Sequence, residues 1–294
     1  MQYVGRFAPT PSGPLHFGSL VTALASWLDA RSQQGKWLLR IEDLDPPREE
    51  PGAATLILNT LEALGLTWDD QVLYQSQRGE AYSEALQQLS EQGLAYPCSC
   101  TRKELAGHTR YPGYCRSGSR HPKRPHAWRF AVDPQVTINW NDRVQGQQTW
   151  PLKLAGDVVI RRKDQLWAYQ LAVVVDDLFQ GVTHIVRGID LLDSTPWQLA
   201  LKSALAPTRP QPSFAHLPVI VNHQGQKLSK QNKATAISVT AANQLLTRAL
   251  QALNQPLLSH WQEATAEEIL HFAMANWKLS EVPSSKAIPE ERLT

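Results

Sequence analysis

The fold is decided by residues 3–20, which read YVGRFAPTPSGPLHFGSL. Residues 3–8 have the apolar character of a short buried strand, whereas the prolines and the glycine at 9–14 exclude regular structure. An amphipathic run typical of a helix begins at Leu20. Such a strand, loop and helix can hold a phosphate, because free N–H groups and the positive dipole end meet the anion at the helix N-terminus. His16 lies within reach of the same anion; the alternative is an ordinary connection with a surface histidine.

A second strand follows this helix. The helix is predicted over residues 19–34, where apolar residues recur at helical spacing, and Gly35 ends it. Residues 36–43 predict a strand that ends in the acidic turn 42–45. Two strands joined by a helix form a parallel βαβ unit, whose ligands bind beyond the carboxyl ends of the strands. The loop after the first strand and the acids after the second are therefore expected to face one crevice.

The remainder of the chain contains further predicted helices and strands. The helices are predicted at 52–64, 78–92, 193–206, 239–253 and 265–278, and the strands at 72–74, 127–132, 136–140, 157–161, 182–186 and 216–221. Residues 166–175 form an apolar stretch that ends at Asp176 and Asp177. The order of these elements predicts an α/β fold, and a shift in composition predicts a small insert at 96–125. The insert would separate the first half of the main domain (1–95) from the remaining insert and second half (126–238), and a C-terminal helical region (239–294) would follow.

Composition indicates the class of protein and its partners. The chain has 294 residues, a net charge of +2 and no apolar run long enough for a membrane span. Its N-terminus lacks the pattern of an export signal, so we expect a cytoplasmic protein with no membrane partner, and we predict a monomer. Between residues 102 and 124, seven basic residues oppose one acid, Glu104. This local excess suits a polyphosphate partner; the alternative is a solvated basic loop.

A second candidate phosphate contact lies far along the chain. Residues 227–230 read Lys-Leu-Ser-Lys, in a polar loop after the strand predicted at 216–221. Two lysines three residues apart suit a triphosphate whose charge shifts during reaction, because ammonium groups on long stems can follow the leaving pyrophosphate. Alone, such a string is most often a solvated loop. Combined with the loop at 9–19 in an α/β chain, it predicts a nucleotide-binding site.

These two segments resemble the HIGH and KMSKS signatures of class I aminoacyl-tRNA synthetases. Four further stretches look like glutamyl-tRNA synthetase: residues 5–13 (GRFAPTPSG), 40–43 (RIED), 172–177 (AVVVDD) and 181–188 (GVTHIVRG). The resemblance extends over residues 3–235. It implies a Rossmann-like parallel sheet, the substrates L-glutamate and ATP, and Mg²⁺ accompanying ATP, with no residue assigned to that ion. Phe17 and Ser19 depart from the first signature, and Gln231 departs from the second.

The resemblance also implies roles for individual residues. Glutamate would be held by Arg6, Phe7, Ala8, Pro9, Thr10, Glu42, Tyr169 and Arg187. A guanidinium pairs bidentately with a carboxylate, so we assign Arg6 to the side-chain carboxylate and Glu42 with Tyr169 to the α-ammonium. Each could instead form a structural salt bridge. ATP would be bound by His16, Gly18, Ser19 and Lys230, and the catalytic residues would be His16, Lys227 and Lys230. No general acid or base is required, because the site contributes positioning and charge stabilisation.

The small insert is expected to bind a metal. It contains three cysteines, Cys98, Cys100 and Cys115. An odd number of cysteines without an export signal disfavours disulfides, and three thiolates in a module with little apolar core suit a structural Zn²⁺. On spacing alone, His108 is the first candidate for the fourth ligand and His121 is the second. Residues 111–115 resemble a variant site in which the tyrosine binds the metal, and this favours Tyr111. The alternative is three unligated thiols.

The chain is short after the lysine loop. The 64 residues 231–294 follow Lys230, whereas an anticodon-binding domain needs roughly 100 or more, so we expect none. A truncated synthetase with this CxC…YxxxC module resembles the glutamyl-queuosine tRNA(Asp) synthetase family. That family esterifies activated glutamate onto queuosine in the anticodon loop of tRNA(Asp), a feasible target for a shallow basic groove. The alternatives are an acceptor-end glutamyl-tRNA synthetase, a nucleotidyltransferase that adenylates a small carboxylic acid without RNA, and a non-catalytic RNA-binding paralogue.

Overall fold

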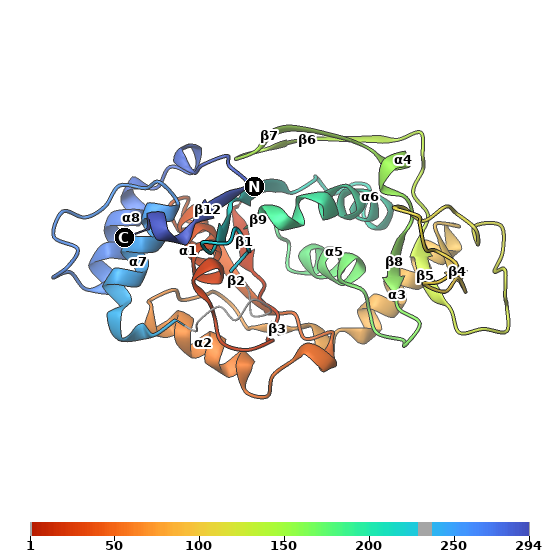
Figure 1. Cartoon of the computed structure of the whole chain (residues 1–294), viewed down its shortest axis with the longest axis horizontal. Coiled ribbons are helices and arrows are strands. Elements are labelled where there is room, and N and C mark those ends of the chain that lie inside the picture. Colours follow the sequence, from red (N-terminus) through yellow and green to blue (C-terminus); the bar gives the residue numbers. More distant parts are fainter. Residues whose placement is uncertain (1, 229–236, 294) are drawn as a thin grey trace.

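The computed structural model describes residues 2–228 and 237–293. Figure 1 shows an elongated molecule whose N-terminal segment lies in the middle, with helices α7 (Ala242–Ala252) and α8 (Ala266–Asn276) at one end and the cysteine-containing insert at the other. Lys230, which the sequence analysis assigns to ATP, lies outside the described residues. Within the described part of the chain, no helix has both the length and the apolar character needed to cross a membrane.

The N-terminal segment forms the predicted βαβ unit. Strand β1 (Val4–Phe7) pairs in parallel with β2 (Lys36–Ile41), with Val4 opposite Lys36. Strand β2 pairs in parallel with β3 (Leu73–Tyr74) on its other side. Helix α1 (Phe17–Arg31) joins β1 to β2. The parallel sheet expected from residues 3–43 is therefore confirmed.

A second group of strands extends this sheet. It contains β9 (His184–Gly188), β10 (Ser213–Leu217), β6 (Thr137–Asp142) and β7 (Gly146–Pro151), in the order β7-β6-β10-β9. All of its pairs are parallel except β6 with β7. The two groups meet at β1, where Thr183 N donates to the carbonyl oxygen of Val4 at 2.9 Å and Val4 N donates to Thr183 Oγ1 at 2.9 Å. Strand β1 is thus the point at which the two halves of the sheet join.

Helix α1 begins earlier than the predicted Ser19. His16 is its N-cap: the backbone there is extended, and Nδ1 accepts a hydrogen bond from Ser19 N at 3.2 Å. A histidine in this role is not among the short polar residues that usually mark a helix start, so the sequence pattern did not reveal it. Beyond the helix, Gly35 passes so close to Tyr3 that an added Cβ would lie 2.6 Å from the tyrosine Cβ. This close approach brings β2 alongside β1.

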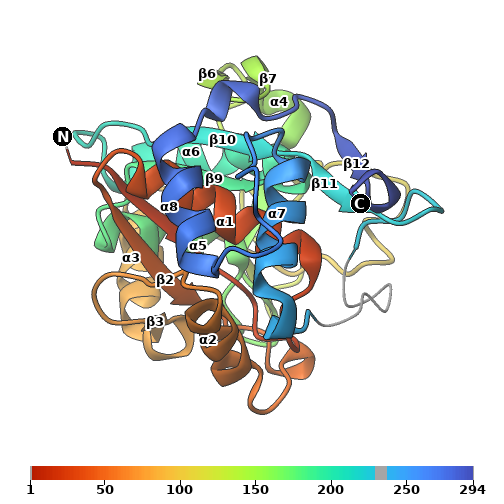
Figure 2. The same cartoon turned by 90° about the vertical axis from the view of Figure 1, so that its left-hand side faces the viewer.

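The larger apolar core surrounds α1. Leu20, Leu24 and Leu28 are completely buried, and α7 and α8 pack against α1 in the same core (Figure 2). Helix α2 (Ala53–Ala63) contributes Ile57 and Leu61 to it. Strand β12 (Ala287–Pro289) pairs with β11 (Val219–Val221). Burying a leucine contributes about 1.5–3 kcal/mol. Because α7 and α8 bury leucines in this core, the C-terminal region contributes to its stability.

A second core lies between the sheet and the insert. Helices α3 (Gly79–Glu91), α5 (Tyr169–Phe179), α6 (Thr195–Leu205) and the short α4 (Leu152–Ala155) surround it. Beside them, β4 (Ala95–Cys98), β5 (Ala127–Phe130) and β8 (Val158–Arg161) form a small antiparallel sheet in the order β4-β5-β8. The cysteines extend from β4 into the loops beyond it.

Several elements differ from the predictions. Residues 166–175, identified only as an apolar stretch, supply the first half of α5. The strand predicted at 216–221 is two strands, because Pro218 lacks an N–H and separates β10 from β11. Strands β4 and β7 were not predicted at all. β7 consists mostly of half-exposed or exposed polar residues, so it has no apolar alternation to detect.

Candidate active site

A cavity of about 360 Å³ opens at the carboxyl ends of β1, β2 and β9, beside the N-terminus of α1. Every predicted glutamate or ATP residue that the structure describes lines it: Arg6, Phe7, Ala8, Pro9, Thr10, His16, Gly18, Ser19, Glu42, Tyr169, Arg187 and Lys227. Its volume is in the range of small-molecule sites. The segments that the sequence analysis placed in one crevice therefore line one cavity, at the sheet edge expected for a parallel α/β fold.

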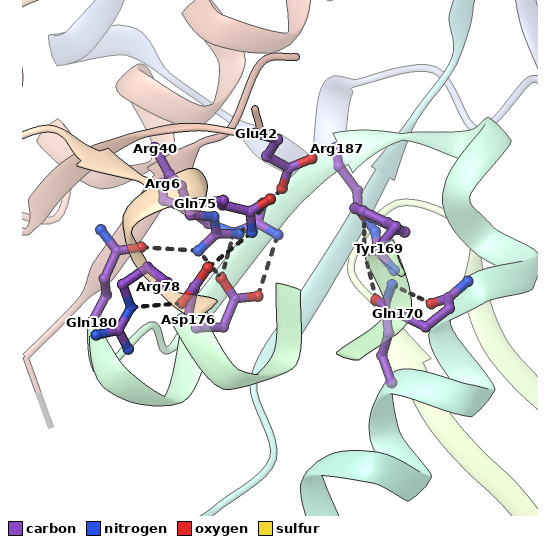
Figure 3. Close-up of polar contacts among 12 residues, drawn as sticks. Arg6, Arg40, Glu42, Gln75, Arg78, Tyr169, Gln170, Asp176, Gln180 and Arg187 are labelled. Atoms are coloured by element: carbon purple, nitrogen blue, oxygen red, sulfur yellow. Dashed lines mark hydrogen bonds and ion pairs between the residues drawn. The ribbon is translucent and has the colours of Figure 1, made fainter. Parts of the chain in front are cut away.

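One wall of the cavity carries a buried ion-pair cluster (Figure 3). Asp177 Oδ1 lies 3.1 Å from Arg6 Nε and 2.7 Å from Arg40 Nη1. Arg40 is fully buried and Arg6 is 4% exposed. Burial acts to raise the pKa of Asp177, but the two guanidiniums prevail and hold it below its usual range. Asp177, from α5, therefore fixes both arginines in place.

The cluster is balanced in charge, and Arg187 adds one positive charge beside it. Glu42 Oε1 lies 3.5 Å from Arg40 Nη2, and Asp176 pairs with Arg78 at 3.1 Å. Burial raises the pKa of Glu42, although Arg40 and Arg6 act to lower it. The cluster together with Arg187 has four guanidiniums (Arg6, Arg40, Arg78 and Arg187) and three carboxylates (Glu42, Asp176 and Asp177), and Lys227 and Asp190, which also line the cavity, form a further pair. With all nine groups ionised, the excess is one positive charge. This balance favours a ligand with a net negative charge.

Arg187 stands apart from the acids (Figure 3). Within residues 2–228 and 237–293 it forms no ion pair, and it is 4% exposed. Its guanidinium donates to neutral acceptors: Tyr169 Oη (3.4 Å), Gln198 Oε1 (2.7 Å), the Leu191 carbonyl (3.3 Å), Thr195 Oγ1 (2.8 Å) and His216 Nε2 (3.0 Å). Burial lowers the pKa of Arg187. A carboxylate bound here would offset that cost of burial.

The other end of the cavity is the N-terminus of α1. His16 Nε2 lies 3.0 Å from Ser19 Oγ. A Cβ added to Gly18 would lie 3.4 Å from the His16 ring and 3.7 Å from the Leu228 carbonyl oxygen. Lys227 Nζ lies 2.6 Å from Asp190 Oδ2. The described start of the lysine loop is therefore packed against the helix N-terminus, as a shared phosphate site requires.

Three residues that organise this cavity, Arg40, Asp177 and Asp190, have no predicted role. Arg40 belongs to the predicted stretch 40–43, and Asp177 is the acidic end of the stretch 166–175. The acidic end of the 166–175 stretch was a signal for Asp177, since a buried helix rarely carries an acid without a partner. No local signal pairs Asp190 with Lys227, because the contact depends on how two distant loops pack.

The three cysteines form a compact buried cluster in the insert. Their sulfurs lie within 4.8 Å of one another, and Cys100 Sγ is 3.6 Å from Cys115 Sγ. Tyr111 Oη lies 3.3 Å from Cys98 Sγ and 3.7 Å from Cys100 Sγ. Burial acts to raise the pKa of Cys115, but hydrogen bonds from the Arg120 backbone and Tyr111 lower it to about 6.

The histidines considered as metal ligands lie elsewhere. His108 Nε2 contacts Tyr114 Oη at 3.0 Å, and His121 pairs with Glu104 at 3.3 Å. Among the described residues, the cysteine cluster includes no histidine within 4.8 Å of all its sulfurs. The geometry thus favours Tyr111 over both histidines as the fourth donor.

Comparison with known proteins identifies the family. Residues 2–281 match the family model described as "tRNA synthetases class I (E and Q), catalytic domain". A glutamyl-Q tRNA(Asp) synthetase of Pseudomonas syringae pv. syringae is 51% identical over 294 residues, 99% of this chain and 98% of the relative. One from Pseudomonas aeruginosa is 50% identical over 293 residues, 99% of each chain. A crystal structure of a glutamate tRNA ligase from Elizabethkingia meningosepticum, in complex with its amino acid, has the same fold. Its TM-score is 0.81 at 24% identity, covering 100% of this chain and 68% of that one. The chain therefore belongs to the class I tRNA synthetase family for E and Q and, within it, groups with the glutamyl-Q tRNA(Asp) synthetases.

Proposed function

We propose that this protein activates L-glutamate with ATP and transfers the glutamate to queuosine in the anticodon loop of tRNA(Asp), in the cytoplasm. The observation that carries the proposal is the cavity that joins the buried Arg187, whose hydrogen bonds in the described chain go to neutral acceptors, to a helix N-terminus. Glutamate at neutral pH has two carboxylates and one ammonium, a net charge of about −1. The excess positive charge around the cavity complements it. The relatives' names support the RNA substrate.

The charges suggest how glutamate is oriented. Asp177 accepts from Nε and Nη2 of Arg6, which leaves the Nη1 donors for the side-chain carboxylate. Glu42, whose pKa is raised by burial, gains most from a cation, so we assign the α-ammonium to it together with Tyr169. Arg187 supplies the second guanidinium on the opposite wall. Residues 7–10 line the same cavity and would contact the ligand beside these groups.

The phosphates of ATP are assigned to the other end of the cavity. His16, Gly18 and Ser19 would hold them at the helix N-terminus, with Lys227 and Lys230 from the loop. A glutamate α-carboxylate oxygen attacks the α-phosphorus in line, the bond to the pyrophosphate oxygen breaks, and the electron pair leaves with pyrophosphate. These residues supply position and positive charge rather than a proton. Mg²⁺ entering with ATP would add charge neutralisation.

Transfer to RNA completes the reaction. A hydroxyl of the queuosine cyclopentenediol attacks the glutamyl carbonyl carbon, and AMP leaves. Residues 1–95 and 126–238 would form the catalytic domain, and the basic insert 96–125 would lie close to the phosphates of the RNA, where a local positive charge favours binding. The C-terminal helices α7 and α8 would stabilise this domain by packing against α1.

We also propose that Cys98, Cys100, Cys115 and Tyr111 hold one structural Zn²⁺. With Zn–S bonds of about 2.3 Å, tetrahedral ligand atoms lie roughly 3.8 Å apart. The separations of 3.6 Å between Cys100 and Cys115 and of 3.3 and 3.7 Å from Tyr111 fit that arrangement. The ion would supply stability to the insert and no catalytic step.

The test uses the complete protein in two assays. Glutamate-dependent exchange between pyrophosphate and ATP measures adenylate formation, and labelled glutamate then reports transfer to tRNA prepared from cells with and without queuosine. We expect exchange without RNA, and label only on the queuosine-containing tRNA. Equal labelling of both tRNA preparations would indicate an acceptor-end enzyme. Exchange without any transfer would indicate a nucleotidyltransferase, and no exchange at all would remove the proposed chemistry.

A further inference from the structure

A buried histidine contacts the guanidinium of Arg187 from behind. His216, on β10, has no exposed surface, and its Nε2 accepts from Arg187 Nε at 3.0 Å. Thr195 Oγ1 accepts from Arg187 Nη2 at 2.8 Å and lies 3.2 Å from His216 Nε2. A nitrogen that accepts from Arg187 carries no proton. His216 is therefore neutral, with its proton on Nδ1.

An equally buried carboxylate fixes that tautomer. Asp142, the last residue of β6, places Oδ2 2.5 Å from His216 Nδ1, and both side chains have zero exposure. Its other oxygen, Oδ1, accepts from three backbone N–H groups, those of Val144 (3.1 Å), Gln145 (2.9 Å) and His216 (3.1 Å). The carboxylate cannot rotate without breaking those bonds. Asp142 thus holds the proton of His216 on Nδ1 and keeps Nε2 free to accept.

We propose that Asp142 and His216 are a positioning pair that orients Arg187 for the glutamate carboxylate. The inference deepens the proposed function and rests on its assignment of Arg187 to glutamate. Neither residue lines the cavity, so both act through Arg187. The chain Asp142–His216–Arg187 also brings a negative charge, one residue removed, toward a guanidinium that forms no ion pair among the described residues. All five N–H groups of Arg187 donate to protein acceptors, so a bound carboxylate would replace the two longest of these contacts, those to Tyr169 Oη (3.4 Å) and the Leu191 carbonyl (3.3 Å).

The substitution Asp142→Asn tests the tautomer with almost no change in shape. The three backbone N–H groups require an oxygen at the position of Oδ1, so the new NH₂ must face His216 Nδ1. That nitrogen then has to accept, the histidine proton moves to Nε2, and Nε2–H opposes Arg187 Nε–H. A hydrogen bond to a charged group is worth about 1.5–3 kcal/mol. We therefore expect KM for glutamate in pyrophosphate exchange to rise about 10- to 100-fold, with KM for ATP unchanged.

The second variant, His216→Gln, distinguishes a change in the orientation of Arg187 from a general destabilisation of the protein. In His216→Gln, the amide oxygen can accept from Arg187 and no tautomer exists to be misplaced. We expect Asp142→Asn to add little to the glutamate KM in the His216→Gln background. Nitrogen NMR of ¹⁵N-histidine protein should report Nε2 of His216 as unprotonated in the wild type and protonated in Asp142→Asn. The His216 signal is assigned by its loss in His216→Gln.

Three results would overturn the proposal. They are an unchanged His216 tautomer in Asp142→Asn, an unchanged glutamate KM, and the same fold-loss from Asp142→Asn in both backgrounds. If Asp142→Asn does not fold, His216→Gln is compared with His216→Leu, and equal glutamate KM values for these two would also refute it. Asp164→Asn, in the exposed Arg162–Asp164 pair, is the matched control. Failure of wild-type exchange would contradict the proposed function instead.

Discussion

Replacing Asp177 by asparagine should destabilise the protein strongly. The carboxylate pairs with Arg6 and Arg40, which are 4% and 0% exposed, so the substitution leaves two guanidiniums buried beside a neutral amide. Removing one partner of a buried ion pair costs about 3–5 kcal/mol. For 294 residues the entropy of unfolding is roughly 0.6 kcal/mol per kelvin. The melting temperature of Asp177→Asn should therefore fall by about 5–8 °C.

The assay is a thermal melt at neutral pH, with Asp164→Asn as the matched control. Asp164 pairs with Arg162 on the surface at 2.6 Å, where side chains are 50% and 43% exposed. An exposed pair is worth less than about 1 kcal/mol, so this variant should lose under about 2 °C. Equal losses in the two variants would refute the argument that burial decides the cost.

The same pair has a defined pH dependence. The two guanidiniums hold the pKa of Asp177 below its usual range against the effect of burial. A depressed carboxyl pKa contributes stability above the unfolded value of about 4, and that stability is lost as the pH falls through the folded value. The difference in melting temperature between wild type and Asp177→Asn should therefore shrink on acidification. A constant difference across that range would contradict the ion-pair explanation.

Three further perturbations test the site and the insert. Cys100→Ser should lower zinc content, measured by atomic absorption, together with the melting temperature; unchanged metal stoichiometry would remove Cys100 from the ligand set. Lys230→Ala should depress pyrophosphate exchange far more than glutamate binding measured by calorimetry, because its charge acts in the transition state; equal losses would argue against that role. Glu42→Gln should weaken glutamate binding at least about tenfold by removing the partner of the α-ammonium, while glutarate, which lacks the ammonium, should bind both proteins alike.

Local sequence patterns were sufficient to predict the segments that line the cavity. The apolar strand, the proline-rich loop and the acids after β2 are contiguous signals, and the rule that parallel strands bind ligands at their carboxyl ends brought them together. The start of α1 was misplaced because histidine is an uncommon N-cap. Strand β7 was missed because an exposed strand has no apolar alternation.

The residues that hold the cavity-lining side chains in place depend on contacts that no local pattern encodes. Asp142 and His216 meet only because β6 and β10 become neighbours in the sheet, and Asp177 reaches Arg6 although the two residues lie 171 positions apart in the sequence. The apolar stretch that leads to Asp177 fits a buried helix as well as a buried strand. Sequence motifs thus located the residues that line the cavity, and the structure was needed to identify the residues that hold them in place.

The position of β1 has a consequence for the growing chain on the ribosome. Its first neighbour, β2, emerges soon after it, but Thr183, which binds its other edge, comes 179 residues later. At about 5–20 residues per second, translation takes roughly 10–35 s to supply that edge. During this interval an apolar strand is open to pairing with another nascent chain. Slow synthesis or crowded polysomes should therefore favour aggregation of this protein, and a chaperone that covers the N-terminal half should relieve it.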